Sequence, residues 1–223
     1  MTNSKKITVI GASGGSGRKI IEALLAQGHK VTALSRSASK VFRSNVRSID
    51  GSALNKEVLR KAIKGQDAVI ITLGISENPI RVRTLGPAKT PMNIRSEGTR
   101  KAIEVMKELG VKRLLVQTTF GSGPSKNELG TMDSLFFALL LKPQIVDTEK
   151  QDEFVRTSGL DWTITQPVHL KEDNYIEGDV VADFNSQVGR MGISRKLVGS
   201  YTASAINDST TIGKTVTLST TQI

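Results

Sequence analysis

The feature that most constrains this 223-residue chain is a set of spaced glycines directly after its first apolar segment. Ile7 to Ile10 predict a short buried strand, the turn Gly11-Ala12-Ser13-Gly14-Gly15-Ser16-Gly17 follows, and an amphipathic helix begins at its end. Small residues let the backbone turn tightly, approach a pyrophosphate and offer free amide hydrogens at a positive helix end. The strand-turn-helix context argues against a tight turn without a ligand. We therefore expect a dinucleotide to contact Gly11, Ser13, Gly14, Gly15, Ser16 and Gly17.

The rest of the chain repeats a simple alternation of helix, glycine and strand. An amphipathic helix ends at a glycine, which tolerates the left-handed backbone, and an apolar strand begins shortly afterwards. The four pairs are Gly28 with Val31 to Leu34, Gly65 with Ala68 to Leu73, Gly110 with Leu114 to Val116, and Gly159 with Trp162 to Thr165. Apolar strands that alternate with helices predict a parallel sheet covered on both faces. We expect a single α/β domain over residues 1–223, a three-layer Rossmann fold with a doubly wound, mainly parallel sheet.

This alternation weakens at about residues 75–91 and 121–145, in both cases directly after a predicted strand. Ligands of open parallel sheets bind outside the carboxyl ends of the strands. Because long irregular loops in compact domains are often functional, we expect these two loops to form walls of a substrate cleft. The alternative is that they are passive insertions.

Composition and charge argue against several other functions. The chain has no cysteine and two histidines, which excludes thiol chemistry and argues against a metal site. Residues 1–113 hold 22 Lys and Arg against 8 Asp and Glu, a net charge of +14, whereas residues 114–223 hold 9 against 13. The basic residues are scattered, which argues against nucleic acid and favours a field that attracts a polyanionic cofactor. Apolar runs are too short for a membrane span or a signal peptide, so we expect a cytoplasmic protein.

The end of the second predicted strand indicates which nicotinamide cofactor is bound. Proteins that select NAD usually place an acid there for the ribose hydroxyl, whereas this chain has Ser35-Arg36-Ser37. An arginine suits a 2′-phosphate, so Arg36 predicts NADP(H), with NADPH preferred over NADH, unless it is only a surface charge. Arg18, at the start of the first helix, is a second candidate for a phosphate contact.

Two other strand ends complete the expected cofactor site. Asp50 and Gly51 are expected to face the adenine edge. Thr72, Leu73 and Gly74 are expected to let the backbone lie against the cofactor. For both segments the alternative is ordinary turn chemistry at a strand end.

The tyrosine and lysine of classical short-chain dehydrogenases are missing. Those enzymes use a tyrosine, and a lysine four residues later, as their acid system. Here Tyr175 is followed at that spacing by Asp179, and Tyr201 by Ala205. The proton for any reduction must come from another side chain or from water, or hydride transfer must dominate the reduction of the acceptor.

Several sequence blocks together resemble a known family. Besides the glycine turn and Arg36, they are Arg95-Ser96-Glu97-Gly98-Thr99-Arg100, Gly110-Val111-Lys112-Arg113, and Arg156-Thr157-Ser158-Gly159-Leu160 before Asp161-Trp162-Thr163. With them the chain resembles the atypical short-chain dehydrogenases of the NAD(P)H-binding, NmrA-like superfamily. Within it, the Ser-Glu-Gly block and its spacing resemble most closely the biliverdin-IXβ reductase/flavin reductase family. The resemblance extends from Ile7 to about His169.

The resemblance implies that the ends of two later strands flank the nicotinamide. Thr118 and Thr119 are expected there, either with hydroxyls that orient substrate or relay a proton, or only as β-branched residues that finish a strand. Pro167 is expected beside the carboxamide of the cofactor. His169 is expected either as a titrating group near the hydride path or as a structural histidine.

The resemblance also points to a helix that carries four charged residues. Asp147, Glu149, Lys150 and Asp152 occupy the position where the family's active-site helix passes the substrate. Thr148 stands where the biliverdin reductase pattern has histidine, which argues against tetrapyrrole reduction. The other interpretation of the four charges is a solvated helix face.

Together these features favour an NADPH-dependent oxidoreductase that passes hydride to a flat, conjugated acceptor such as a flavin, quinone or tetrapyrrole. The alternative is a non-catalytic redox sensor that binds NADP(H) and regulates a protein partner. An isomerase or epimerase acting on a nucleotide sugar is disfavoured, because the chain lacks the tyrosine and the carboxy-terminal substrate domain of those relatives. The oligomeric state, monomer or homodimer, stays open at this point.

Overall fold

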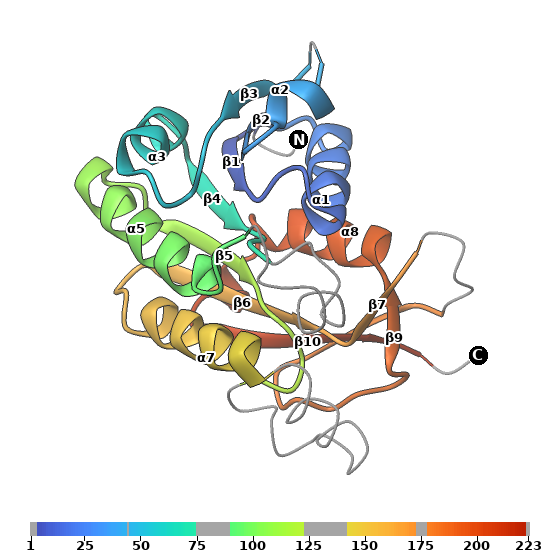
Figure 1. The fold of residues 1–223 in the computed structure, drawn as a ribbon. Coiled ribbons are helices and arrows are strands. Elements are labelled where there is room, and N and C mark those ends of the chain that lie inside the picture. Colours follow the sequence, from blue (N-terminus) through green and yellow to red (C-terminus); the bar gives the residue numbers. More distant parts are fainter. Residues whose placement is uncertain (1–3, 44, 75–89, 123–141, 173–177, 222–223) are drawn as a thin grey trace, which may run out of the picture.

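A long, mainly parallel sheet runs through the computed structural model, which describes residues 4–43, 45–74, 90–122, 142–172 and 178–221 (Figure 1). In these ranges the main sheet has eight strands in the order β3-β2-β1-β4-β5-β6-β10-β8, and β8 alone runs antiparallel to its neighbour. The α/β Rossmann fold expected from the sequence is confirmed. The strands are β1 (Lys6–Ile10), β2 (Lys30–Ser35), β3 (Arg47–Asp50), β4 (Ala68–Ile71), β5 (Arg113–Gln117), β6 (Asp161–Pro167), β8 (Val180–Asp183) and β10 (Lys214–Thr220).

Helices cover both faces of this sheet, as Figure 1 shows. Two of them lie on one face, α1 (Gly15–Ala26) and α8 (Arg195–Ala205). On the other face lie α3 (Lys56–Ile63), α5 (Ile94–Leu109) and α7 (Lys142–Arg156). The smaller elements are α2 (Ala38–Val41), the 3-10 turn Ser209–Thr211, and a two-stranded parallel sheet of β7 (His169–Lys171) and β9 (Gly192–Ser194).

The order of the strands places a switch point at the centre of the sheet. The chain starts at β1, moves outward through β2 to β3, and then crosses back to β4 on the other side of β1. Ile10 is therefore paired with Leu34 of β2 on one side and with Ile71 of β4 on the other. Connections diverge to opposite faces at such a point, which opens a crevice at the carboxyl ends of the strands.

The hydrophobic core is divided by the sheet into two layers. Ile20 and Leu24 of α1 are buried in the layer that also contains residues of α8, and Gly199 lets α8 approach the backbone of Lys19 closely. Leu59 of α3 and Met106 of α5 belong to the opposite layer. The buried residues of α1 and α3 are apolar or glycine, as expected for helices that lie on a parallel sheet.

The helix ends and strand positions predicted from glycine are confirmed. Gly28, Gly65, Gly110 and Gly159 all have positive φ values, between 69° and 80°, and each precedes a strand of the sheet. The observed strands differ from the predicted ones by one or two residues at their ends. β8, β9, α8 and β10 had no counterpart in the sequence-based prediction, which placed no helix or strand after His169.

The two expected cleft loops fall largely outside the residues that the structure describes. Of the loop at about 75–91, Thr90 and Pro91 are described, and of the loop at about 121–145, positions 121–122 and the start of α7. Tyr175 also lies outside the described residues. Among the helices that the structure describes, none is both long enough and apolar enough to cross a membrane.

Candidate functional site

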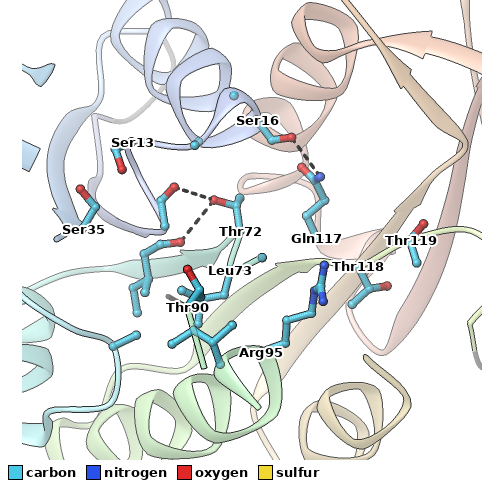
Figure 2. A pocket seen from close by; sticks show the side chains of 18 of the residues that line it. Ser13, Ser16, Ser35, Thr72, Leu73, Thr90, Arg95, Gln117, Thr118 and Thr119 are labelled. Carbon is cyan, nitrogen blue, oxygen red and sulfur yellow. Dashed lines mark hydrogen bonds between the residues drawn. The ribbon is translucent and has the colours of Figure 1, made fainter. Parts of the chain in front are cut away.

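One cleft of about 880 Å³ lies at the carboxyl ends of the central strands, at the switch point between β1 and β4. This volume is within the range of small-molecule and cofactor sites. Figure 2 shows side chains from several strands converging on it. The site residues predicted from the sequence that line it are Gly11, Ser13, Gly14, Gly15, Ser16, Gly17, Arg36, Gly51, Thr72, Leu73, Gly74, Thr118, Thr119, Pro167 and His169.

At two of its glycines the turn is packed so tightly that a side chain does not fit. Gly11 has a φ of +88°, and a Cβ atom there would lie 2.6 Å from the carbonyl oxygen of Thr72. A Cβ on Gly17 would lie 2.6 Å from the carbonyl oxygen of Gly11. Helix α1 begins at Gly15 with no acidic residue in its first turn. Its first backbone N–H groups have no partner within the helix, so the turn is suited to an anion such as a pyrophosphate.

The end of β5 is tied to the first turn of α1. The side-chain amide of Gln117 donates a hydrogen bond of 3.1 Å to the hydroxyl of Ser16, which Figure 2 shows as a dashed line. Thr72, directly after β4, has its Oγ1 3.3 Å from the carbonyl oxygens of Ile10 and Gly11. Residues at the ends of β4 and β5 thus hold the glycine turn that follows β1.

At the carboxyl end of β2, Arg36 lines the cleft, as expected from the sequence. The guanidinium of Arg36 is exposed, and its Nη2 donates to Oγ1 of Thr90, 3.1 Å away. Arg18 lines the cleft as well, but its Nε donates to the carbonyl oxygen of Ser13 at 2.9 Å. Both arginines are exposed and each donates one of these bonds, and Arg36 is the one that directly follows β2, where a 2′-phosphate is expected.

The neighbouring Asp50 is not among the residues that line the cleft. Its carboxylate accepts a hydrogen bond of 2.8 Å from the backbone N–H of Ser39 and a second bond from the hydroxyl of the same residue. These bonds lower the pKa of the Asp50 carboxyl. Asp50 thus contacts the start of α2, and Gly51, whose N–H donates to the carbonyl oxygen of Ser35, is the member of the pair that lines the cleft.

Arg195 at the start of α8 lies over the glycine turn, and sequence reasoning missed it. Its Nε is 2.7 Å from the position that a Cβ on Gly15 would occupy, and its Nη1 pairs with Glu172 at 2.6 Å. The absence of a side chain at Gly15 therefore makes room for a cation. No motif after His169 pointed to this residue, because the contact joins segments that are 180 residues apart.

Arg95 of α5 also lines the cleft, and Figure 2 shows its side chain extending from α5 toward the end of β5. Its Nη1 is buried and has no hydrogen-bond partner among the described residues. Burial lowers the pKa of Arg95, and the nearby Asp147 opposes this shift. By contrast, the guanidinium of Arg113, also buried, donates to Asp161, Thr163, Ala205, Ile206 and Thr211.

Asp147 of α7 caps the start of α5. Its carboxylate accepts hydrogen bonds from the backbone N–H groups of Arg95, at 3.0 Å, and Ser96, at 3.2 Å, and from the Ser96 hydroxyl. Asp147 is 5% exposed and Asp152 is 3% exposed. The interpretation of this segment as a solvated helix face is therefore wrong for these two residues, although Lys150 is exposed.

Asp152 lies behind the cleft, next to Thr118. The side-chain amide of Gln166 lies 3.4 Å from its Oδ2, while its Oδ1 has no hydrogen-bond partner in the part of the chain that the structure describes. Burial raises the pKa of Asp152 to about 7, against smaller lowering effects of Arg156 and Thr118. A carboxyl with such a pKa is protonated in a large fraction of molecules at neutral pH.

The remaining predicted residues lie at the same end of the cleft. Thr118 is held by its backbone N–H, which donates to the carbonyl oxygen of Thr165 at 2.9 Å. Thr119 donates from its Oγ1 to the carbonyl oxygen of Phe120 at 3.3 Å. His169, on β7, is exposed, and Pro167 is buried at the end of β6. In the described ranges, no three His, Asp or Glu side chains are grouped so as to hold a metal ion.

Comparisons with known proteins agree with this arrangement. A family model described as NAD(P)H-binding matches residues 11–209. An uncharacterized chloroplastic protein of Arabidopsis thaliana is 26% identical over 212 residues, which cover 91% of this chain and 72% of that protein. The uncharacterized protein YwnB of Bacillus subtilis is 29% identical over 165 residues, which cover 73% of this chain and 71% of that protein.

Solved structures share the fold over nearly the whole chain. A short-chain dehydrogenase/reductase of Veillonella parvula, in complex with NADP, has a TM-score of 0.78 at 17% identity and covers 97% of this chain and 95% of its own. ChuY, an anaerobillin reductase of Escherichia coli, has a TM-score of 0.76 at 19% identity and covers 98% of both chains. At these identities the likeness concerns the fold.

Proposed function

Since this chain belongs to the NAD(P)H-binding family, we propose that it is an NADPH-dependent oxidoreductase that transfers hydride to a flat, conjugated acceptor. The observation that carries this proposal is the continuity of the cleft. The glycine turn and the polar side chains at the ends of β5 and β6 line one space, so a dinucleotide bound on the turn would reach Thr118 and Pro167. Bound NADPH would supply the hydride, while the protein holds donor and acceptor together.

Each part of the cleft has a role in this proposal. The first turn of α1 would hold the pyrophosphate, with Arg195 above Gly15 as an additional cation. Arg36 would bind the 2′-phosphate, which is the basis for expecting NADPH rather than NADH. Thr118 and Pro167 would flank the nicotinamide, with Thr119 and His169 beside the acceptor.

The acceptor is proposed to carry an acidic group. Arg95 lines the cleft with a buried nitrogen that lacks a partner among the described residues, whereas the buried guanidinium of Arg113 is extensively hydrogen-bonded. Because leaving a buried donor without a partner is costly, Arg95 is suited to bind an anionic group of a ligand. A flavin phosphate or a tetrapyrrole carboxylate fits this requirement. The shared fold with ChuY, an anaerobillin reductase, supports keeping tetrapyrroles among the candidates, even though Thr148 departs from the biliverdin reductase pattern.

The test measures NADPH oxidation by absorbance. The candidate acceptors are FMN, FAD, riboflavin, small quinones and biliverdin, and each is also tried with NADH. We expect turnover above the uncatalysed rate with NADPH, and higher kcat/KM for FMN than for riboflavin, which lacks the phosphate. Tight binding of both NADP⁺ and NADPH without turnover of any acceptor would instead favour the redox sensor. The missing Tyr-x-x-x-Lys pair is compatible with that second function.

A further inference from the structure

We propose, on the basis of the oxidoreductase function above, that Asp152 and Thr118 form a proton relay from α7 to the nicotinamide end of the cleft. In this relay the Thr118 hydroxyl gives a proton to the reduced acceptor, and Asp152 restores it. The relay would replace the missing Tyr-x-x-x-Lys pair. Thr118 would be the catalytic residue, and Asp152 would be the proton store that acts through it.

The position of Thr118 carries the first step of the argument. It lines the cleft directly after β5 and is 9% exposed, and its Oγ1 has no hydrogen-bond partner among the described residues. Its backbone is fixed by the bond to Thr165 of β6. A buried hydroxyl that opens onto a ligand site and lacks a partner is suited to bond a ligand atom there.

The second step is the buried carboxyl on the other side of that hydroxyl. Asp152 does not line the cleft, and it is close enough to Thr118 for the hydroxyl to lower its pKa. Its Oδ1 lacks a partner among the described residues, as does Oγ1 of Thr118. The two atoms thus have unused hydrogen-bonding capacity in the same buried region. Rotation of one hydroxyl would link the carboxyl to the cleft.

Gln166 holds this carboxyl in place. Its side-chain amide lies 3.4 Å from Oδ2 of Asp152 and also donates to the carbonyl oxygen of Ser122, 3.0 Å away. Gln166 is fully buried on β6. Its amide leaves Oδ1 of Asp152 available, which makes Gln166 a positioning residue for the relay.

The charges around Asp152 leave it able to both hold and release a proton. On its own helix, Arg156 favours the ionised form and Glu149 opposes it, while β6 and the segment after β5 contribute the neutral Gln166 and Thr118. From α5, the charged Arg95 faces Asp147 near the start of α7. Arg156 forms no ion pair with Asp152 in the described structure.

Instead of pairing with the carboxyl, Arg156 is engaged elsewhere. Its Nη2 donates to Oγ1 of Thr215 at 2.6 Å, and its guanidinium lies 5.4 Å from the ring centre of Trp162. Burial therefore dominates, and the pKa of Asp152 stays at about 7. A general acid works best when its pKa lies near the working pH.

The proposed step conserves atoms and electrons. The hydride and its electron pair come from the reduced nicotinamide cofactor. The O–H bond of Thr118 breaks as an O–H or N–H bond forms on the acceptor, and the Thr118 oxygen takes the proton of Asp152. Asp152 is left as a carboxylate, and a proton from water restores it before the next turnover.

The first test needs neither cofactor nor acceptor. The carboxyl signals of cofactor-free protein, labelled with ¹³C at aspartate, would be followed by NMR between pH 4 and 9. We expect one signal with a midpoint near 7 that is lost in Asp152→Asn. Thr118→Val should raise this midpoint, because it removes a group that lowers the pKa. Glu153→Gln, an exposed neighbour on α7, is the control and should leave it unchanged.

The second test uses turnover with the best acceptor of the panel. Asp152→Asn and Thr118→Val should each lower kcat about a hundredfold, the lower end of the usual contribution of general acid catalysis, with little change in KM. Thr118→Ser should restore most of the activity, and the limb of the pH profile near 7 should vanish in Asp152→Asn. Glu153→Gln should keep the wild-type profile.

The two proposals fail in different ways. The relay would be overturned by a titration midpoint of Asp152 below 5, or by a midpoint that is the same in Thr118→Val as in the wild type. Either result would count whether or not an acceptor is found. A wild-type pH profile in Asp152→Asn would also overturn it while leaving the reductase function intact. Absence of turnover with every acceptor would count against the reductase, whereas a midpoint near 7 that moves in Thr118→Val would still support the coupled pair.

Discussion

The two ends of the cleft differ in the groups that form them, which are backbone groups at one end and side chains at the other. At the glycine turn the backbone forms the site, because a side chain on Gly11 or Gly17 would collide with a carbonyl oxygen. At the ends of β5 and β6 the site is formed by polar side chains, of which Arg95 and Thr118 still have atoms without partners among the described residues, and the buried Asp152 lies behind them. Under the proposed function, the first end would recognise a fixed ligand shape, while the second end has polar groups that would bind a substrate or change its charge.

The largest effect is expected from breaking the backbone-built end. Gly17→Val should raise the Kd for NADPH a hundredfold or more, about 3 kcal/mol, because even a Cβ there would lie 2.6 Å from a carbonyl oxygen. Fluorescence titration measures this, and circular dichroism checks folding. Gly65→Ala is the control: its φ of +71° should cost stability of roughly 1–2 kcal/mol but leave the Kd unchanged. Equal loss of binding in both variants would contradict the prediction.

The next effect concerns the pH dependence of stability at the side-chain-built end. The folded-state pKa of Asp152, about 7, lies above the value of 3.8 expected in the unfolded chain. The proton therefore stabilises the fold fully below pH 4, and this contribution is lost as the pH rises toward 7. From pH 4 to pH 8 the wild type should lose on the order of a few kcal/mol of unfolding free energy that Asp152→Asn does not lose, so the pH change should favour the variant by that amount.

Urea unfolding at several pH values measures this difference. Glu153→Gln, which changes an exposed carboxylate on the same helix, serves as the reference. If the stability of Asp152→Asn followed the same pH curve as that of the wild type, the buried carboxyl would not be the group that titrates.

A smaller effect tests the choice of cofactor at the backbone-built end. Arg36→Glu should weaken NADPH binding relative to NADH roughly thirtyfold, about 2 kcal/mol, because charge-assisted bonds to the 2′-phosphate are replaced by repulsion. The measurement is the ratio of the two Kd values. Arg43→Glu makes the same change of charge at an exposed residue that does not line the cleft, and should leave the ratio near that of the wild type.

The smallest effect sharpens the assignment of the acceptor end. Arg95→Met should raise KM for FMN about tenfold, about 1.4 kcal/mol, and leave KM for a neutral quinone unchanged. Arg100→Met, on the exposed side of the same helix, where Arg100 pairs with Glu97, is the matched control. A uniform change with both acceptors would show that Arg95 acts on the fold of the site and not on an anionic group.

The sequence was sufficient to predict the fold and the backbone-built end of the cleft. Their requirements are local, since a glycine is needed wherever φ is positive or the chain approaches itself closely, and the spacing of these glycines is visible without a structure. Arg36 lines the cleft for a similar reason, because it follows directly after a predictable strand. Asp50, which was expected to face the adenine, does not line the cleft, because its carboxylate contacts Ser39.

The side-chain-built end could not be predicted in the same way. The buried face of α7 is polar, so hydrophobic periodicity points away from it, and its charges look like those of a solvated helix. Only the packing of α7 on α5, with Gln151 donating to Thr99 at 2.8 Å, shows that this face is covered. Arg195 likewise approaches Gly15 only because α8 packs on α1.

The cap that Asp147 places on α5 has a consequence for the exchange of backbone hydrogens with solvent. The first amides of a helix normally exchange quickly, because they have no acceptor within the helix. Here the amides of Arg95 and Ser96 donate to a buried carboxylate that belongs to another helix. Their hydrogens should be released only when α5 and α7 separate, so they report the opening of the cleft wall in deuterated water.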